Sequence, residues 1–246
     1  CPQFPGGCTP PAGTTALALA QVLRFHAHPV RGSGIVSYDV KDGGQAFTLR
    51  RDFSESAYAW EDMPDVLSPD SPEKARQAVS ELVVDAGLAL RTPYACSGSD
   101  AGIGDVAETA REFFGYREGA SLLDRSQYDA GPAWPNRLAE EIAAGRPALL
   151  RLESRLPGAR DLPRAVTWIL DGQREGPLLF HLNTGLGPEA GVWVSPDLLL
   201  AGSRAGDRVA QTALAGLAPP GLAPAPLSPA RADRKSTRLN SSHGYI

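Results

Sequence analysis

The chain has 246 residues, a formal net charge of −4 and 21% charged residues, a composition that is ordinary for a soluble globular protein. The acidic balance and the lack of any Lys/Arg cluster argue against a nucleic-acid partner. No run of 18 apolar residues occurs, so we expect no membrane span.

The two ends of the chain are interpreted separately. The chain starts at Cys1 with neither an initiator Met nor a signal peptide, so we expect a fragment that lacks its N-terminus. Residues 206–232 are rich in Ala, Pro, Gly and Leu and predict a disordered tail. We exclude residues 233–246 from the biology, because Asp233 to His243 match the translation of a common sequencing adapter.

An apolar stretch from Ala12 to His28 predicts a helix in an interior environment. We expect Thr14 or Thr15 to cap it, with Gly13 allowing a sharp turn, and Pro29 to end it. A helix start of this kind is either a simple cap or the position of a nucleophile, since the helix dipole favours a thiolate or an oxyanion there. The residues alone leave both interpretations open.

The remaining elements follow in chain order. Two short alternating segments, Gly32–Tyr38 and Gln45–Leu49, predict strands. Helices are predicted from Ser71, which we expect to be the N-cap, from about Asp105 to Gly115, and over Asn136–Ala144. Gly87 is expected at or near the end of the first of these three helices.

Four short apolar runs after Pro147 predict strands of one antiparallel sheet: Ala148–Leu152, Val166–Leu170, Leu178–Asn183 and Val192–Val194. Asp171-Gly172 predicts a hairpin turn. Helices followed by strands predict an α+β fold, with a mainly helical half at 1–125 and a mainly β half at 126–205. A cleft between two such halves would be the expected ligand site.

The three cysteines are Cys1, Cys8 and Cys96. They are too few for a disulfide framework, and their spacing does not match a zinc site. A Cys1–Cys8 disulfide in an oxidising compartment stays open. We expect no metal and no cofactor.

The stretch from Gly13 to Pro29 reads G-T-T-A-L-A-L-A-Q-V-L-R-F-H-A-H-P. It is followed in order by R-G-S-G-I-V-S-Y, Y-A-W-E-D-M, S-E-L-V-V-D-A-G, S-G-S-D-A, E-F-F-G-Y, W-I-L-D-G and F-H-L-N-T-G-L-G. In their order and in their residues, these segments resemble the streptopain family of bacterial cysteine peptidases, over about residues 8–200. The resemblance implies a papain-like fold in a peptidase domain at 1–205, with a cleft between its two halves.

The resemblance also implies that the catalytic machinery has been replaced. The family's nucleophilic cysteine aligns with Thr14 and its general-base histidine with Val166. The tryptophan after the conserved asparagine aligns with Thr184, and the second tryptophan aligns with Leu186. A threonine hydroxyl needs a base within hydrogen-bond reach, and valine cannot be one. Loss of both nucleophile and base typically costs about 10⁶-fold in rate.

Other residues keep the family pattern or offer alternatives. Gln21 and Asn183 remain, and Ser97, Gly98 and Ser99 form either a solvated loop or, by family analogy, the border of a peptide groove. These five are the expected binding residues, with a peptide or protein as partner.

Two further residues were considered as replacements for the catalytic pair. Cys96 could be a displaced nucleophile, but no helix dipole or evident base supports it. His181 lies two residues before Asn183 and therefore on the same strand face, although the family often has a histidine there that is not the base.

Two functions therefore compete. The favoured one is a secreted, catalytically inactive pseudopeptidase that binds peptide or protein in the residual cleft. The alternative is an active cysteine-type endopeptidase, with a non-standard nucleophile or with misread catalytic codons. A purely structural extracellular domain is a third possibility. Secretion is implied by the resemblance alone.

Overall fold

The structure is a computed structural model that describes residues 8–42, 44–128, 131–154, 165–174, 176–185, 191–199 and 209–222. The chain forms two compact units. Unit 1 contains the described residues up to Tyr116 together with Gly185, and unit 2 contains those from Arg117 to Thr184 and from Gly191 onward. The first boundary between the units falls at 116/117, whereas the sequence predicted a division at 125/126.

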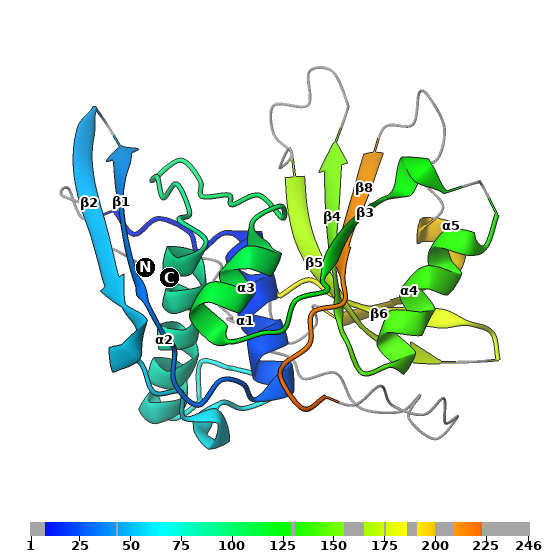
Figure 1. Cartoon of the computed structure of the whole chain (residues 1–246), viewed down its shortest axis with the longest axis horizontal. Coiled ribbons are helices and arrows are strands. Elements are labelled where there is room, and N and C mark those ends of the chain that lie inside the picture. The colour runs from blue at the N-terminus through cyan, green and yellow to red at the C-terminus, as the bar shows by residue number, and fades with distance from the viewer. Residues whose placement is uncertain are drawn as a thin grey trace. The chain divides into compact units, whose positions relative to one another are not determined.

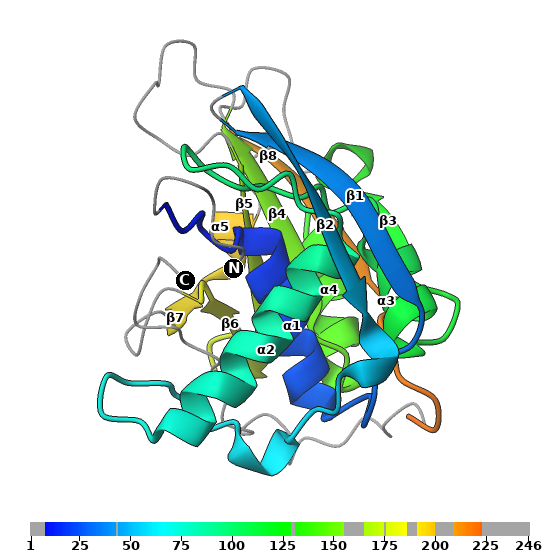
Figure 2. The same ribbon diagram turned by 90° about the vertical axis from the view of Figure 1, so that its left-hand side faces the viewer.

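Unit 1 combines three helices with a β-hairpin (Figure 1). The helices are α1 (Thr14–His26), α2 (Glu73–Ala89) and α3 (Val106–Phe114), and two short 3₁₀ turns span Phe53–Glu55 and Trp60–Asp62. The hairpin strands β1 (Ile35–Asp42) and β2 (Gln45–Asp52) pair antiparallel, as the alternating segments predicted. α1 and α2 pack side by side (Figure 2).

The predicted interior helix is confirmed as α1, in which Leu19, Val22 and Leu23 are fully buried. The predicted threonine cap is wrong. Gly13 is the N-cap residue, with φ 85° and ψ 141°, and no side chain caps the helix. The helix ends before Pro29, as predicted, through a left-handed Ala27.

The helices α2 and α3 form where the amphipathic spacing placed them, but the cap of α2 differs from the prediction. Pro72 is the N-cap residue of α2, and Ser71 instead accepts a hydrogen bond at its hydroxyl from the Ser68 N–H. Gly87 lies inside α2, where Ala16 and the Tyr94 ring pack closely around it. Gly115 ends α3 in the left-handed conformation that the sequence predicted.

A buried carboxylate links α2 to the rest of unit 1. Asp85 is fully buried and accepts hydrogen bonds from the Tyr58 hydroxyl at 3.0 Å and from Arg51 Nη2 at 3.2 Å. Arg51 Nε also lies 2.8 Å from Asp85 Oδ1, as an ion pair. Burial and the neighbouring Asp85 raise the pKa of Tyr58, so its hydroxyl stays protonated and continues to donate. This pairing offsets the cost of removing the charge from water.

Unit 2 is built on a six-stranded sheet with strand order β3-β8-β4-β5-β6-β7 (Figure 1). All neighbouring strands pair antiparallel. The strands are β3 (Ser121–Asp124), β4 (Ala148–Ser154), β5 (Ala165–Arg174), β6 (Leu179–Asn183), β7 (Gly191–Val194) and β8 (Val209–Ala215). The four strands predicted after Pro147 are confirmed as β4 to β7.

The prediction of a disordered tail at 206–232 is wrong for Val209–Ala215, which form β8 between β3 and β4. Ala213 and Leu214 are fully buried. A strand rich in alanine gives little propensity signal, and its pairing on both sides supplies what the sequence pattern does not. Residues 206–208 and 223–246 lie outside the described residues.

One face of this sheet forms the core of unit 2 against α4 (Ala133–Ala143) and α5 (Pro196–Leu199). Both helices lie on the same side of the sheet (Figure 1). The core consists of Trp134, Leu138, Ala148, Leu150, Leu170, Phe180, Leu182, Leu199 and Ala213. Since side chains alternate along a strand, the residues between these project from the opposite face.

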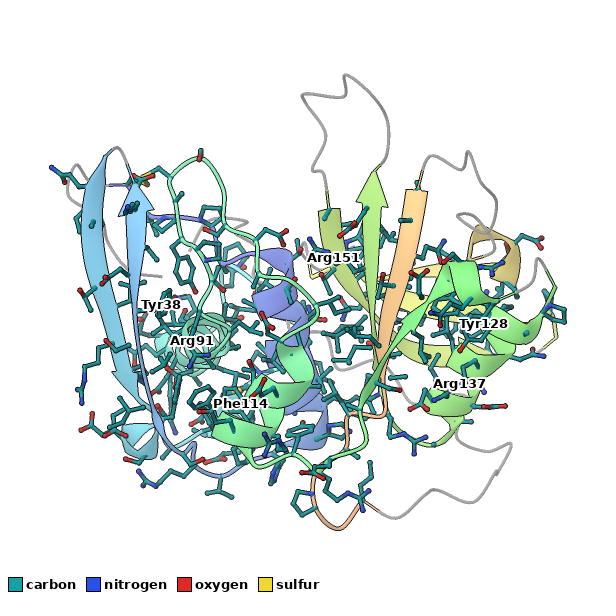
Figure 3. The ribbon with its side chains drawn as sticks, turned by 45° about the horizontal axis from the view of Figure 1, so that its top comes forward. Tyr38, Arg91, Phe114, Tyr128, Arg137 and Arg151 are labelled. Carbon is teal, nitrogen blue, oxygen red and sulfur yellow. A yellow bond between two sulfur atoms is a disulfide. The ribbon has the colours of Figure 1, made fainter. Side chains whose placement is uncertain are left out.

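Glu141 on α4 organises a second ionic network. Its carboxylate accepts hydrogen bonds from Arg137 and Arg146, and from the Gly216 N–H at 3.0 Å. Burial acts to raise the pKa of Glu141, but the hydrogen bonds and charges of Arg146 and Arg137 outweigh it and leave this pKa below its usual value. Figure 3 labels Arg137 and, nearby in the same unit, Tyr128.

Candidate functional site

In unit 1 the loop that follows α2 docks on the first turn of α1. The buried Thr15 hydroxyl donates to the Ala101 carbonyl oxygen at 2.6 Å. A Cβ on Gly13 would lie only 2.9 Å from the Ser99 carbonyl oxygen. Glycine is therefore required at position 13 for two reasons, the close approach of the loop backbone and the positive φ. The S-G-S-D-A segment predicted to border a peptide groove thus lies directly at the start of α1.

Thr14 is the first residue of α1 and is half-buried. The structure therefore brings the expected nucleophile position to a helix N-terminus, where the dipole would favour a negative charge on a reacting group. A threonine there offers a hydroxyl, which ionises far less readily than a thiol and depends on a base.

The loop residues Ser97 and Gly98 are exposed and Ser99 is half-buried. Cys96 forms a disulfide with Cys8, with the two Cα atoms 6.0 Å apart. This settles two possibilities that the sequence left open: Cys8 does not pair with Cys1, and Cys96 has no thiol to act as a displaced nucleophile. Cys1 itself lies outside the described residues.

Gln21 lies two turns along α1 from Thr14 and is only 3% exposed. Its Nε2 lies 2.7 Å from where a Cβ of Gly185 would be. Gly185 belongs to the F-H-L-N-T-G-L-G segment and therefore closely approaches the buried amide of Gln21. The sequence indicated both residues but gave no sign of this contact.

In unit 2, Val166 is half-buried on β5, opposite Leu152. Asn183 is 1% exposed at the end of β6, opposite Ile169. The strand alternation therefore puts Thr167 and Ile169 on the sheet face of Asn183, whereas Val166 projects from the other face. Thr184 is half-buried, and Leu186 lies outside the described residues.

Arg151 lies on the same sheet face as Thr167 and Asn183 and is buried there. It pairs with Thr167 across β4 and β5, its Nη1 lies 3.5 Å from the Thr167 hydroxyl, and its Nε donates to Glu153 at 2.9 Å. Figure 3 labels Arg151 on the sheet. Thr167 and Arg151 were missed by the sequence reasoning. The only signal in the sequence was a Thr and an Arg among the apolar residues of the predicted strands.

His181 is 2% exposed, and its Nδ1 lies 2.5 Å from Asp171 Oδ1. Trp193 packs against the imidazole, with ring centroids 5.1 Å apart. Asp171-Gly172 does not form the predicted hairpin turn. It lies inside β5, where the register shifts between Leu170 and Gly172. This irregularity is a β-bulge, which re-aims a side chain, here the Asp171 carboxylate beside His181.

The described part of the chain contains no group of three or more His, Cys, Asp or Glu side chains arranged to hold a metal ion. None of its helices is long and apolar enough to cross a membrane.

Comparisons with known proteins agree with this arrangement. Residues 1–192 match the Peptidase C10 family. Streptopain from Streptococcus pyogenes serotype M28 is 24% identical over 179 residues, which are 71% of this chain and 43% of streptopain. The thiol protease/hemagglutinin PrtT of Porphyromonas gingivalis is 27% identical over 187 residues, 76% of this chain and 20% of PrtT. The chain thus spans less than half the length of these curated relatives.

Among solved structures, the active wild-type interpain A cysteine protease of Prevotella intermedia is similar, with a TM-score of 0.68 and 26% identity over 82% of each chain. A prointerpain A fragment gives the same TM-score at 25% identity, covering 86% of this chain and 65% of the fragment. The fold class is therefore the α+β papain-like fold that the sequence predicted. Because residues 1–192, most of the chain, match the peptidase C10 family, the chain belongs to this family, which is also called the streptopain family.

Proposed function

We propose that this chain is a catalytically inactive pseudopeptidase that binds a peptide or protein at the loop Ser97–Ser99, beside the start of α1. The observation that carries the proposal is Thr14 itself. It occupies the helix start where the family alignment puts the cysteine nucleophile, while the aligned base position holds Val166. A valine in the aligned base position cannot take the proton from the Thr14 hydroxyl, which such a nucleophile needs for activation.

Two features support retention of a binding role. The loop is fixed to α1 through Thr15 and Gly13, so its exposed residues Ser97 and Gly98 are presented by a rigid element. Rigid presentation lowers the entropic cost of binding a ligand. The retained Gln21 supports the same region, because it packs under Gly185.

Secretion is part of the proposal. The Cys8–Cys96 disulfide supports it, since disulfides form and persist in oxidising compartments and are rare in the cytosol.

The catalytic half of the proposal is tested by rebuilding the pair. We expect Thr14→Cys combined with Val166→His to give measurable hydrolysis of a fluorogenic peptide, and the single variants to give none. Addition of Thr184→Trp should raise the rate further. A folded double variant that stays inert would mean that these two positions do not form the site.

The binding half is tested with fluorescein-labelled casein peptides and fluorescence anisotropy. Ser97→Trp should block the loop and weaken binding at least tenfold. Ser121→Trp, at an equally exposed serine of β3, is the matched control and should bind as the wild type does. Equal binding by both variants would remove the loop from the proposal.

The alternative of an active endopeptidase rests on one observation, the adapter-like run at 233–243, which raises the possibility of misread codons. Resequencing of the gene distinguishes the two. A cysteine codon at position 14 and a histidine codon at position 166 would favour the active enzyme. Cys96 cannot be the nucleophile of such an endopeptidase, because its sulfur is in a disulfide.

A further inference from the structure

The Cys8–Cys96 disulfide joins two segments of unit 1 that are 88 residues apart in the sequence. Cys8 belongs to the segment that leads into α1, and Cys96 to the loop that carries Ser97 and Ser99. Cys96 is exposed and Cys8 half-buried, so a small thiol or dithiol can reach the bond from solvent.

The loop is held independently of this disulfide. Thr15 donates to the Ala101 carbonyl oxygen at 2.6 Å, and the Ser99 carbonyl packs on Gly13. At the other end of the loop, the Cys96 N–H donates to Asp42 Oδ1 at 3.1 Å. These contacts remain when the disulfide opens.

The segment leading into α1 has fewer means of attachment. It reads C-T-P-P-A-G from Cys8 to Gly13, and its two prolines have no N–H to donate. Pro10 and Ala12 are buried, but apolar contact alone does not fix the backbone as a cross-link does. Opening the disulfide therefore frees this segment before it frees the loop.

The Asp42 side chain lies next to the Cys8–Cys96 disulfide. Its Oδ2 lies 3.0 Å from Cys96 Sγ, where a disulfide sulfur has no proton to donate. Thiol–disulfide exchange requires a thiolate to approach one sulfur and a second thiolate to leave from the other. The Asp42 carboxylate repels both of these negative charges, so it slows reduction. Once Cys96 is a protonated thiol, it can donate to the same oxygen and help keep the loop in place.

We propose that the Cys8–Cys96 disulfide is a redox switch and that the Asp42 carboxylate slows its reduction. A dithiol reductant supplies two electrons and two protons, is itself oxidised to a disulfide, and leaves two free thiols. The segment from Cys8 to Ala12 is then released while the loop stays on α1. This inference concerns the fold of unit 1 and does not depend on the proposed ligand or on inactivity.

The first test measures reduction of the full chain by dithiothreitol, with alkylation and mass spectrometry to follow Cys8 and Cys96. We expect Asp42→Asn to be reduced about fivefold faster than the wild type at low ionic strength, from the loss of one charge close to the sulfur. The amide oxygen of the variant still accepts from the Cys96 N–H. The matched control Asp39→Asn, on the same strand, should behave as the wild type.

Salt and hydrogen exchange complete the test. In 1 M NaCl the difference between Asp42→Asn and the wild type should shrink, because the charge is screened. After reduction, backbone amides of residues 8–13 should exchange at least fivefold faster than in the oxidised protein, and those of residues 95–103 less than twofold faster. The double variant Cys8→Ser/Cys96→Ser should show the same exchange rates without reductant. Equal reduction rates in all three proteins, release of both segments together, or free thiols in the untreated protein would each overturn the proposal.

Discussion

Gly13 is the residue on which the geometry at the start of α1 depends most. Its φ of 85° with ψ of 141° lies in a region that side chains rarely adopt, and a Cβ would lie 2.9 Å from the backbone oxygen of Ser99. The obstacle is backbone and cannot rotate away, so Gly13→Ala must push the loop off the helix or move the helix start.

The cost can be worked from these two terms. A non-glycine residue in this backbone region costs about 1–3 kcal/mol. Displacement of the loop also breaks the buried Thr15–Ala101 hydrogen bond, at about 1–3 kcal/mol for the unsatisfied groups. Alanine recovers about 0.4–1 kcal/mol by restricting the unfolded chain. We therefore expect Gly13→Ala to lower the free energy of unfolding by about 1–6 kcal/mol.

Two other glycines separate the terms. Gly44 has φ 81° with no atom within 4 Å of a Cβ, so Gly44→Ala reports the backbone cost alone. Gly104 has neither feature, and Gly104→Ala should be neutral or slightly stabilising. Urea unfolding followed by far-UV circular dichroism and by fluorescence of Trp60, which lies in unit 1, gives the three values. A Gly13→Ala variant that loses no more stability than Gly44→Ala would contradict a close contact between Gly13 and the loop.

Two further predictions concern the buried carboxylates. Asp85→Ala leaves Arg51 and Tyr58 without their shared acceptor and should destabilise the protein by about 3–5 kcal/mol in urea unfolding; a loss below about 1 kcal/mol would contradict the network. Glu141 has a lowered pKa in the folded state, so its stabilisation is fully present above its unfolded value of about 4.5 and is lost as the pH falls through the folded pKa. Urea unfolding measured from pH 7 to pH 3 should show this loss of stability in the wild type and less of it in Glu141→Gln. The control Glu140→Gln replaces a side chain that is 70% exposed and should lose stability as the wild type does. Parallel curves for all three proteins would show that Glu141 is not the responsible group.

Much of the fold could be predicted because its elements follow local patterns. The apolar stretch of α1 and the amphipathic spacing of α2 and α3 are encoded within each segment, and short apolar runs bounded by Gly and Pro mark β4 to β7. The strand β8 could not be found in this way, because Val209–Ala215 is rich in alanine and its strand state depends on pairing with β3 and β4.

Some positions of the candidate site could be located in the fold for the same reason. Thr14 could be placed at a helix start because the helix itself was clear. The Cys8–Cys96 pairing could not be derived, since connectivity does not follow from spacing. Asp171-Gly172 has the composition of a hairpin turn, yet a bulge inside β5 directs Asp171 to His181. The Asp171–His181 contact depends on the register of β5 against β6, which the local composition does not encode.

Turnover is the most direct test of the proposal that the reactive pair has been replaced. The purified chain would be incubated with casein and with a fluorogenic peptide, beside a Thr14→Ala variant, and probed with a thiol-directed epoxide. We predict no hydrolysis above the level of Thr14→Ala and no covalent labelling. Hydrolysis by the wild type that Thr14→Ala abolishes would contradict the proposal, because it would show that the hydroxyl at the start of α1 is an active nucleophile.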